Sequence, residues 1–246
     1  MKKYKVFKIF DINFHDISLN LLSDKLDKGA GLMTFPAAPA LINIYKDQLY
    51  CDAIKNSDLV LFDSGYLCLL LKFFKDIHVK KLSGLKFLKF FFNTVKKNKK
   101  KIFLINPSII DNKINKHYLK SIGVKSFKGY IAPKYSKYVK DKKLIKLINK
   151  IKPKYILINI GGGTQEKLGY YIKKKINFNS SIICTGAAIA FLTGRQAKIP
   201  NFIDKLYLGW FFRILFSPKL YFMRYYNSFK LIKMILSYDI KTYVKK

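Results

Sequence analysis

One carboxylate in this chain is well placed for acid–base chemistry. Asp63 directly follows the strand-like run 58–62, and the small residues Ser64 and Gly65 come after it. A carboxylate at the end of a buried strand can take a proton from a substrate hydroxyl and act as a general base. Aspartate is equally suited to cap the helix expected to start near Tyr66. The residue types alone leave both interpretations open.

A glycine-rich loop is the second candidate for chemistry. The segment 161–166 reads GGGTQE and follows the apolar run 155–160. Backbone amides of glycines at the start of a helix can approach an anion or a sugar closely. Gln165 can hydrogen-bond sugar hydroxyls or phosphate, or it can be an exposed residue of the first helical turn. The loop lacks the spacing of an ATPase phosphate loop or a dinucleotide fingerprint, so it favours neither an ATPase nor an NAD enzyme.

Metal, disulfide and hydrolase patterns are not found in the sequence. There is no Asp-x-Asp pair, and no histidine has an acidic or thiol partner at ligand spacing: His15, His78 and His117. We therefore expect no bound metal. The cysteines are far apart in apolar surroundings, which predicts buried free thiols. They are Cys51, Cys68 and Cys184.

The charge of the chain is strongly positive but diffuse. Its 246 residues include 48 Lys and Arg against 14 Asp and Glu, a formal net charge of +34, and only Arg195, Arg213 and Arg224 are arginine. Nucleic-acid-binding surfaces cluster their cations and use arginine for forked phosphate and base contacts. Diffuse lysine therefore argues against nucleic acid as a partner. A field this positive still attracts nucleotide-sugars, pyrophosphate lipids and acidic membranes.

Short apolar runs alternate with amphipathic stretches along the chain. Strands are predicted for 58–62, 101–105, 126–130, 155–160 and 180–184, and helices for 110–122 and 142–151. This alternation predicts an α/β fold with a Rossmann-like, mostly parallel sheet and flanking helices. Ligands bind such sheets beyond the carboxyl ends of the strands. We expect four residues that follow strand ends to share one cleft: Asp63, Asn106, Gly161 and Gly186.

Composition changes near residue 201, where aromatic side chains and cations become interleaved. Such a pattern is typical of helices at a membrane interface, and equally of a terminal helix pair packed onto a domain. We divide the chain into a Rossmann-like core, residues 1–200, and a membrane-proximal C-terminal appendage with basic and aromatic helices, residues 201–246. No window offers the ~18 uncharged apolar residues that a membrane-spanning helix requires.

An ordered set of motifs resembles the WecG/TagA/CpsF family of bacterial glycosyltransferases. The family's opening Thr-containing loop is matched by Thr34, its strand-end aspartate by Asp63, and its Arg-x-x-Gly element by Lys81 and Gly84. Its Gly-x-Pro-x-Gln-Glu loop is matched by 161–166 and its Gly-Ala strand end by 186–188. Its closing Trp-x-x-Arg, Pro and Arg-Tyr pattern is matched within 210–225.

The resemblance implies an inverting, metal-independent transfer from a UDP-sugar to an undecaprenyl-pyrophosphate-linked saccharide in cell-surface polysaccharide synthesis. The sugar moved would be a hexose or an N-acetylhexosamine, and Asp63 would deprotonate the acceptor. Other residues matched to the family's motifs would bind substrate: Thr34, Lys81, Gly161, Gln165, Glu166 and Gly186. In the appendage, membrane or diphosphate contacts are implied for Trp210, Arg213 and Arg224. No cofactor is expected, because the UDP-sugar is a substrate.

The resemblance also implies partners and a location. These are a polyprenyl-pyrophosphate saccharide acceptor, a UDP-sugar donor, the anionic surface of the inner membrane, and a homo-oligomer formed through the core. The protein is expected to be cytoplasmic and peripheral at the inner face of the cytoplasmic membrane. The alternative left open is a non-catalytic basic module that binds nucleic acid or anionic membrane. An NAD-dependent Rossmann enzyme is the weakest interpretation.

The chain departs from the family's pattern at several motif positions. The family usually has Asn, Arg, Pro, Asp, Glu and Arg where this sequence has Pro36, Lys81, Gly163, Ala190, Gly209 and Lys219. Losing a forked guanidinium and a second carboxylate changes how a sugar would be held. The identity of the donor sugar therefore stays open.

Overall fold

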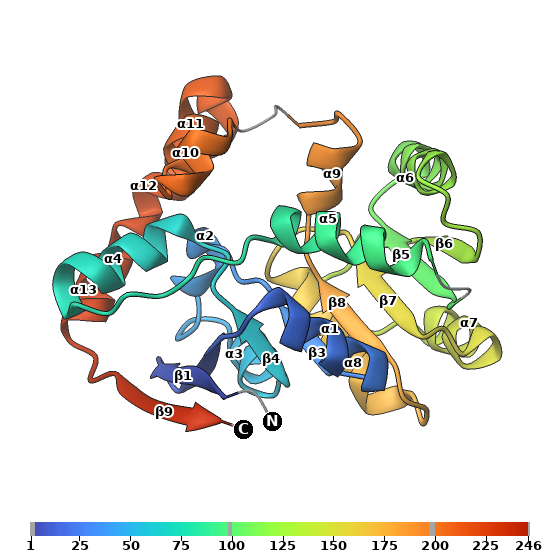
Figure 1. Ribbon diagram of the computed structural model, residues 1–246, viewed down its shortest axis with the longest axis horizontal. Coiled ribbons are helices and arrows are strands. Elements are labelled where there is room, and N and C mark those ends of the chain that lie inside the picture. Colours follow the sequence, from blue (N-terminus) through green and yellow to red (C-terminus); the bar gives the residue numbers. More distant parts are fainter. Residues whose placement is uncertain (1–2, 98–99, 197–199, 246) are drawn as a thin grey trace.

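The computed structural model describes residues 3–97, 100–196 and 200–245 (Figure 1). Its strands are β1 (Tyr4–Ile9), β2 (Ile12–Asp16), β3 (Gly31–Thr34), β4 (Leu59–Leu61), β5 (Ile102–Asn106), β6 (Phe127–Ile131), β7 (Tyr155–Ile158), β8 (Ser181–Cys184) and β9 (Lys241–Lys245). Its helices are α1 (Leu19–Lys28), α2 (Ala38–Leu41), α3 (Gln48–Lys55), α4 (Gly65–Lys75), α5 (Gly84–Val95), α6 (Ile109–Ser121), α7 (Lys142–Ile151), α8 (Thr164–Lys175), α9 (Ala188–Leu192), α10 (Asn201–Lys205), α11 (Gly209–Phe216), α12 (Pro218–Ser228) and α13 (Lys230–Leu236).

Within the described residues the strands form a nine-stranded sheet in the order β6-β5-β7-β8-β3-β4-β2-β1-β9. Neighbours from β6 to β2 pair in parallel, and β2-β1 and β1-β9 are antiparallel. The predicted Rossmann-like fold is confirmed, and so are the five strands and two helices predicted by their ranges. The sequence interpretation did not include β1, β2, β3 and β9.

Helices cover both faces of the sheet because successive strand side chains point to opposite sides. Leu59 and Leu61 face a core formed with α1 and α5, whereas Val60 and Phe62 face a core formed with α3, α4 and α13. A third cluster packs α7 and α8 onto β5, β7 and β8. Burial on both faces explains why the central strands read as continuous apolar runs. The cysteines are free and buried, as predicted.

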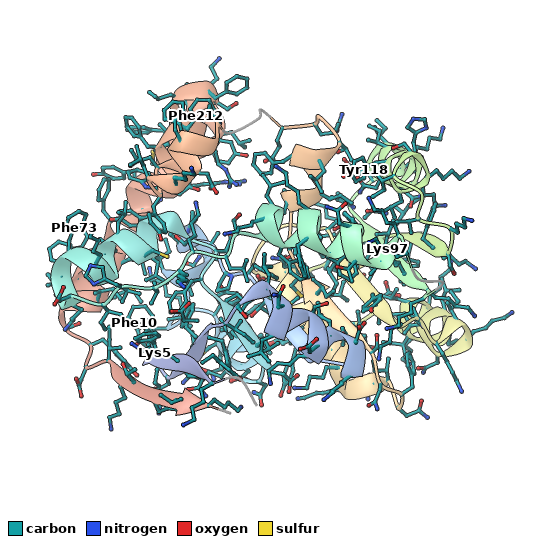
Figure 2. All side chains as sticks on the ribbon, in the orientation of Figure 1. Lys5, Phe10, Phe73, Lys97, Tyr118 and Phe212 are labelled. Atoms are coloured by element: carbon teal, nitrogen blue, oxygen red, sulfur yellow. The ribbon has the colours of Figure 1, made fainter. Side chains whose placement is uncertain are left out.

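The C-terminal segment first leaves the core and then returns to it. Helices α10 to α12 stand at one end of the molecule, with Phe212 on α11 and Phe73 on α4 at that same end (Figure 2). Helix α13 then packs on α4, with Leu231 and Ile235 completely buried, and β9 pairs with β1. Residues 230–245 thus pack on the core and pair with its sheet. The division of the chain into a core and a C-terminal appendage at residue 200 stays a prediction. No helix in the described ranges is long and apolar enough to cross a membrane.

Candidate active site

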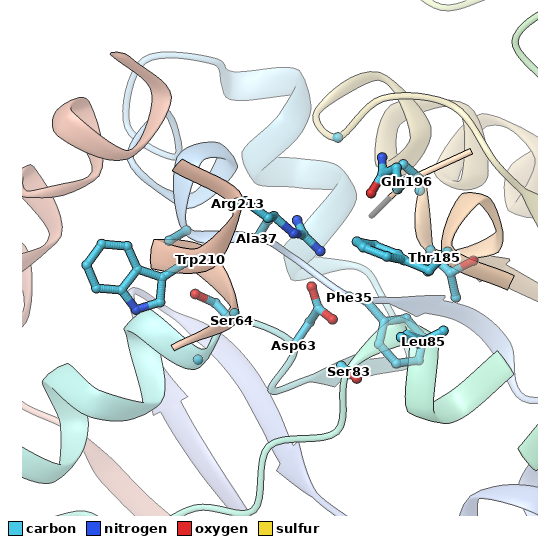
Figure 3. A pocket seen from close by; sticks show the side chains of 18 of the residues that line it. Phe35, Ala37, Asp63, Ser64, Ser83, Leu85, Thr185, Gln196, Trp210 and Arg213 are labelled. Atoms are coloured by element: carbon cyan, nitrogen blue, oxygen red, sulfur yellow. The ribbon is translucent and has the colours of Figure 1, made fainter. Parts of the chain in front are cut away.

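A cavity of about 360 Å³ opens at the carboxyl ends of β3, β4, β7 and β8 (Figure 3). Asp63, Gly161 and Gly186 line it from three of these strand ends, which confirms that they share a cleft. The turn before α11, together with α11 and α12, supplies the opposite wall. The cavity therefore lies where a parallel sheet is expected to bind its ligand, and the C-terminal segment completes it.

Asp63 accepts a hydrogen bond at Oδ1 from the backbone N–H of Gly84, at 2.7 Å. Gly84 is the first residue of α5, whose N-cap is Ser83. Helix α4 is capped by Ser64, which accepts from the N–H of Leu67 at 3.2 Å. Asp63 is therefore not the cap of α4, and its carboxylate faces the cavity with its second oxygen uncommitted in the described structure. The capping alternative for α4 is therefore excluded, and the role of Asp63 as a general base stays a prediction.

The surroundings of Asp63 act on its pKa in opposite directions. Burial raises the pKa of Asp63, whereas the Gly84 hydrogen bond and the charges of Arg213 and Lys81 lower it; the net shift is upward. A carboxylate with a raised pKa holds a proton more readily than a free aspartate. This is the direction that suits a general base working near neutral pH.

Arg213 reaches the cavity from α11. Figure 3 shows its guanidinium and the carboxylate of Asp63 on facing sides of the same space. The guanidinium lies over the ring of Phe191, 4.9 Å from its centroid, and Nε is buried without a hydrogen-bond partner among the described residues. A half-buried guanidinium that lines a cavity and is incompletely paired is suited to bind an anionic group.

The two other predicted appendage residues also line the cavity. The Trp210 ring packs 5.2 Å from that of Tyr66 on α4, so the tryptophan ties α11 to the core. Its indole nitrogen is buried and unpartnered within the described part of the chain. Arg224, on α12, is exposed at the rim. The structure thus brings the appendage residues and Asp63 into one site.

Lys81 also lines the cavity, but its charge is already paired. Its Nζ lies 2.5 Å from Asp204 Oδ1 and 3.0 Å from the Asp204 carbonyl oxygen, and the Lys81 side chain is only 8% exposed. The same ammonium lies 5.4 Å from the ring centroid of Tyr207. Lys81 therefore binds α10 and the turn that follows it.

The glycine-rich loop is organised by Glu166. Glu166 Oε2 accepts from the N–H of Gly163 at 2.6 Å, and Oε1 accepts from Gln165 Nε2 at 2.8 Å. Burial of the carboxyl raises the pKa of Glu166 to about 7. The Gly163 amide is thus not available to a ligand, whereas none of the residues that the structure describes stands against Gly161 to block an approach. Gln165 and Gly161 line the cavity.

Three expected site residues lie away from this cavity. Thr34 and Glu166 are fully buried and are not part of its lining. Asn106 is a correction to the shared-cleft prediction: its Oδ1 accepts from Asn115 and Asn159 at 2.7 and 2.9 Å, so its side chain is used in a buried amide network.

A second cavity, of about 200 Å³, adjoins the first and shares Ala187 and Gln196 with it. It is lined by Asn159, whose Oδ1 is buried and without a described partner, and by Arg195. Sequence reasoning did not single out Asn159, although its place at the end of the run 155–160 was a usable signal. Asp204, Phe191 and Tyr225 were also missed, because only the fold brings them to the site. Among the described residues, no three His, Cys, Asp or Glu side chains gather to hold a metal.

The fold and the cavity are those of an α/β protein in which a strand-end carboxylate, Asp63, faces an arginine from a C-terminal helix, Arg213. A family model described as "Glycosyl transferase WecG/TagA/CpsF family" matches residues 7–245, and the chain belongs to this family of glycosyltransferases. A curated relative is the N-acetylglucosaminyldiphosphoundecaprenol N-acetyl-beta-D-mannosaminyltransferase of Bacillus subtilis (strain 168). It is 25% identical over 222 residues, which cover 85% of this chain and 83% of the relative.

Proposed function

We propose that this glycosyltransferase moves a hexose or an N-acetylhexosamine from a UDP-sugar to a saccharide carried on undecaprenyl pyrophosphate, with inversion and without a metal ion. The observation that carries the proposal is the Asp63 carboxylate, held by the Gly84 amide and facing the Arg213 guanidinium in the strand-end cavity. The acceptor class is the one for which the Bacillus subtilis relative is named.

The proposed reaction is a single displacement. An acceptor hydroxyl attacks the anomeric carbon of the donor sugar while Asp63 takes the hydroxyl proton. The new bond joins the acceptor oxygen to the anomeric carbon, and the bond from that carbon to the β-phosphate oxygen breaks. UDP leaves with the bonding electron pair. Attack from the face opposite to UDP inverts the anomeric configuration.

Charge developing on UDP would be stabilised by cations that line the cavity. Arg213 is incompletely paired, and Arg224 stands at the rim. Fixed cations of this kind can take the place that a metal ion has in other phosphate-leaving reactions. The adjoining cavity at Asn159, with its unpartnered amide oxygen, offers space and hydrogen bonding for the nucleoside part of the donor.

Peripheral membrane binding is supported by the apolar surface of α10 to α12. Large side chains there are at least 46% exposed: Phe202, Leu206, Phe211, Leu215, Phe216, Leu220, Phe222, Met223 and Tyr226. Clustered exposed aromatic and aliphatic side chains next to cations are typical of an interfacial helix. This surface lies beside the cavity. With these helices on the membrane, the active site would lie next to an acceptor whose lipid stays in the bilayer.

The proposal is tested by product analysis. The protein is incubated with UDP-hexoses and UDP-N-acetylhexosamines and with a short-chain prenyl-pyrophosphate saccharide, in excess EDTA. We expect acceptor-dependent product whose new linkage has the anomeric configuration opposite to that of the donor, as seen in the proton coupling constant. Retained configuration would contradict the single displacement, and complete dependence on an added divalent ion would contradict metal independence.

A further inference from the structure

A third cavity, of about 800 Å³, lies outside the active site. Its walls come from the start of β1, the end of β2, helix α4, the segment 78–80 and the turn 205–207. Tyr207 lines both this cavity and the active-site cavity, so this residue is part of the wall of each. The mechanism proposed above makes no use of this space.

The wall at Tyr207 is held in place from several sides. Its hydroxyl donates to the carbonyl oxygen of Val79 at 3.4 Å, and the Lys81 ammonium lies over its ring. Its φ of 62° is in the left-handed region, which a tyrosine rarely adopts. Gly65 permits this turn to approach α4, because a β-carbon there would stand 2.4 Å from the Tyr207 carbonyl oxygen. The two cavities are therefore fixed side by side.

The third cavity is lined by lysines and by apolar side chains. Five lysines line it, and none forms an ion pair with a described residue: Lys3, Lys5, Lys72, Lys80 and Lys205. The single carboxylate in the lining is Asp16. Apolar lining comes from Leu69, Val79 and Leu206. All five lysines are exposed, and an anion bound among them would reduce the repulsion between their like charges.

The surface around the cavity favours an anion that carries a hydrocarbon chain. Leu206 lines the cavity and is 58% exposed, and Phe73, next to Lys72 on α4, is 72% exposed. Figure 2 shows Phe73 at the end of the molecule where α10 to α12 stand, and Lys5 lower in the view, on β1. A phosphate in the cavity would thus place an attached chain against apolar side chains that have no cover in the described structure.

We propose that this cavity binds the phosphate group of a membrane lipid. The shared chemistry is one or two phosphates on a hydrocarbon chain, supplied either by an anionic phospholipid or by a prenyl pyrophosphate. The site is distinct from the Asp63 cavity and needs no turnover. Bound lipid would hold the protein with the active site beside the membrane surface.

The test measures binding by a triple variant, Lys5→Gln, Lys80→Gln and Lys205→Gln. Its matched control, Lys113→Gln, Lys120→Gln and Lys125→Gln, removes the same charge from exposed positions on and after α6, remote from the cavity. Titration calorimetry with farnesyl pyrophosphate is expected to show at least about tenfold weaker binding for the cavity variant and less than about twofold for the control. Equal losses in the two variants would overturn the site, because they would show only diffuse charge attraction.

Two further measurements identify which kind of molecule supplies the bound phosphate. Farnesyl pyrophosphate is expected to bind wild type about tenfold more tightly than inorganic pyrophosphate; equal affinities would overturn the lipid assignment. Co-sedimentation with phosphatidylcholine vesicles containing either phosphatidylglycerol or farnesyl pyrophosphate, at equal charge, shows which lipid is preferred. Loss of sedimentation in the cavity variant with either vesicle supports the proposal, and unchanged sedimentation with both contradicts it. Acceptor-dependent UDP release is measured separately, so failure of this site and failure of the proposed transfer are distinguishable.

Discussion

The Lys81 ammonium lies 2.5 Å from Asp204 Oδ1 and 3.0 Å from the Asp204 carbonyl oxygen. Lys81 precedes α5 in the core, and Asp204 is on α10 in the C-terminal segment. The Lys81 side chain is 8% exposed and that of Asp204 is 40% exposed, so the pair is shielded mainly on the lysine side. The ion pair holds α10 beside the cavity. While the Lys81 ammonium is paired with Asp204, its charge is not free to bind a ligand.

Asp204→Asn is expected to loosen this connection. The substitution leaves a buried ammonium without its carboxylate, which we expect to cost about 1 to 3 kcal/mol of unfolding free energy. Hydrogen exchange should rise mainly in 200–216. Asp24→Asn, at an exposed position of α1, is the control. Unchanged exchange in 200–216 would show that the ion pair does not hold the segment.

Arg213→Ala is expected to raise the pKa of Asp63 further, because the guanidinium charge lowers it in the native site. A general base must be ionised, so activity is lost as pH falls through its pKa. The acidic limb of kcat/KM should therefore move to higher pH in Arg213→Ala and less in Arg213→Lys, which keeps the charge. An acidic limb that stays in place in both variants would separate Arg213 from Asp63.

Much of the fold could be predicted from the sequence, for a physical reason. The central strands are buried on both faces, so runs such as 101–105 and 155–160 are continuously apolar and easy to recognise. Strands β1 and β9 lie at the sheet margin and contain lysines among their other residues, in the segments YKVFKI and KTYVK, without a regular alternation. That pattern is a weaker signal of a strand than a continuous apolar run. The return of the chain through α13 and β9 depends on contacts with α4 and β1, more than 150 residues away in sequence.

The site residues that directly follow a strand could be predicted from the sequence. The positions of the other site residues were harder to predict. Asp63, Gly161 and Gly186 follow strands directly, and the parallel sheet brings them together. Sequence spacing could not show that Lys81 would be paired with Asp204, or that Glu166 would turn inward to the Gly163 amide. Those outcomes depend on burial and on which partner lies nearest in the folded chain.

Leu231→Ala and Ile235→Ala test whether the end of the chain belongs to the core. Both side chains are completely buried where α13 packs on α4. Each truncation is expected to lower the free energy of unfolding by about 2 to 4 kcal/mol. Leu236→Ala, at a position 52% exposed on the same helix, should change it by about 0.5 kcal/mol or less. Equal small effects at all three positions in urea unfolding would contradict the packing of α13.

Glu166→Gln is expected to change the pH dependence of stability. Burial raises the pKa of Glu166 from 4.5 to about 7 in the folded protein, where Lys167, Tyr50 and Cys184 are its titratable neighbours. Between these values the folded state keeps a proton that the unfolded state has lost. The stability that this proton provides is full below about pH 4.5 and is lost as pH rises through 7, by roughly 3 kcal/mol.

The glutamine variant does not titrate, so the stability of wild type minus that of Glu166→Gln should fall over this pH window. Urea denaturation at intervals between pH 4.5 and 8 measures the difference directly. A difference that stays constant, or that rises with pH, would show that the Glu166 carboxyl is not held in its neutral form by burial.

The most direct test of the account is the initial rate of acceptor-dependent UDP release by wild type and by Asp63→Asn, with UDP binding measured in parallel. The asparagine keeps the shape and can still accept the Gly84 hydrogen bond, but it cannot take a proton. We predict a rate lower by about 10² to 10⁴-fold with UDP affinity within about twofold of wild type, and no change for Asp24→Asn. A rate near that of wild type in Asp63→Asn would remove Asp63 from the chemistry and contradict the central claim.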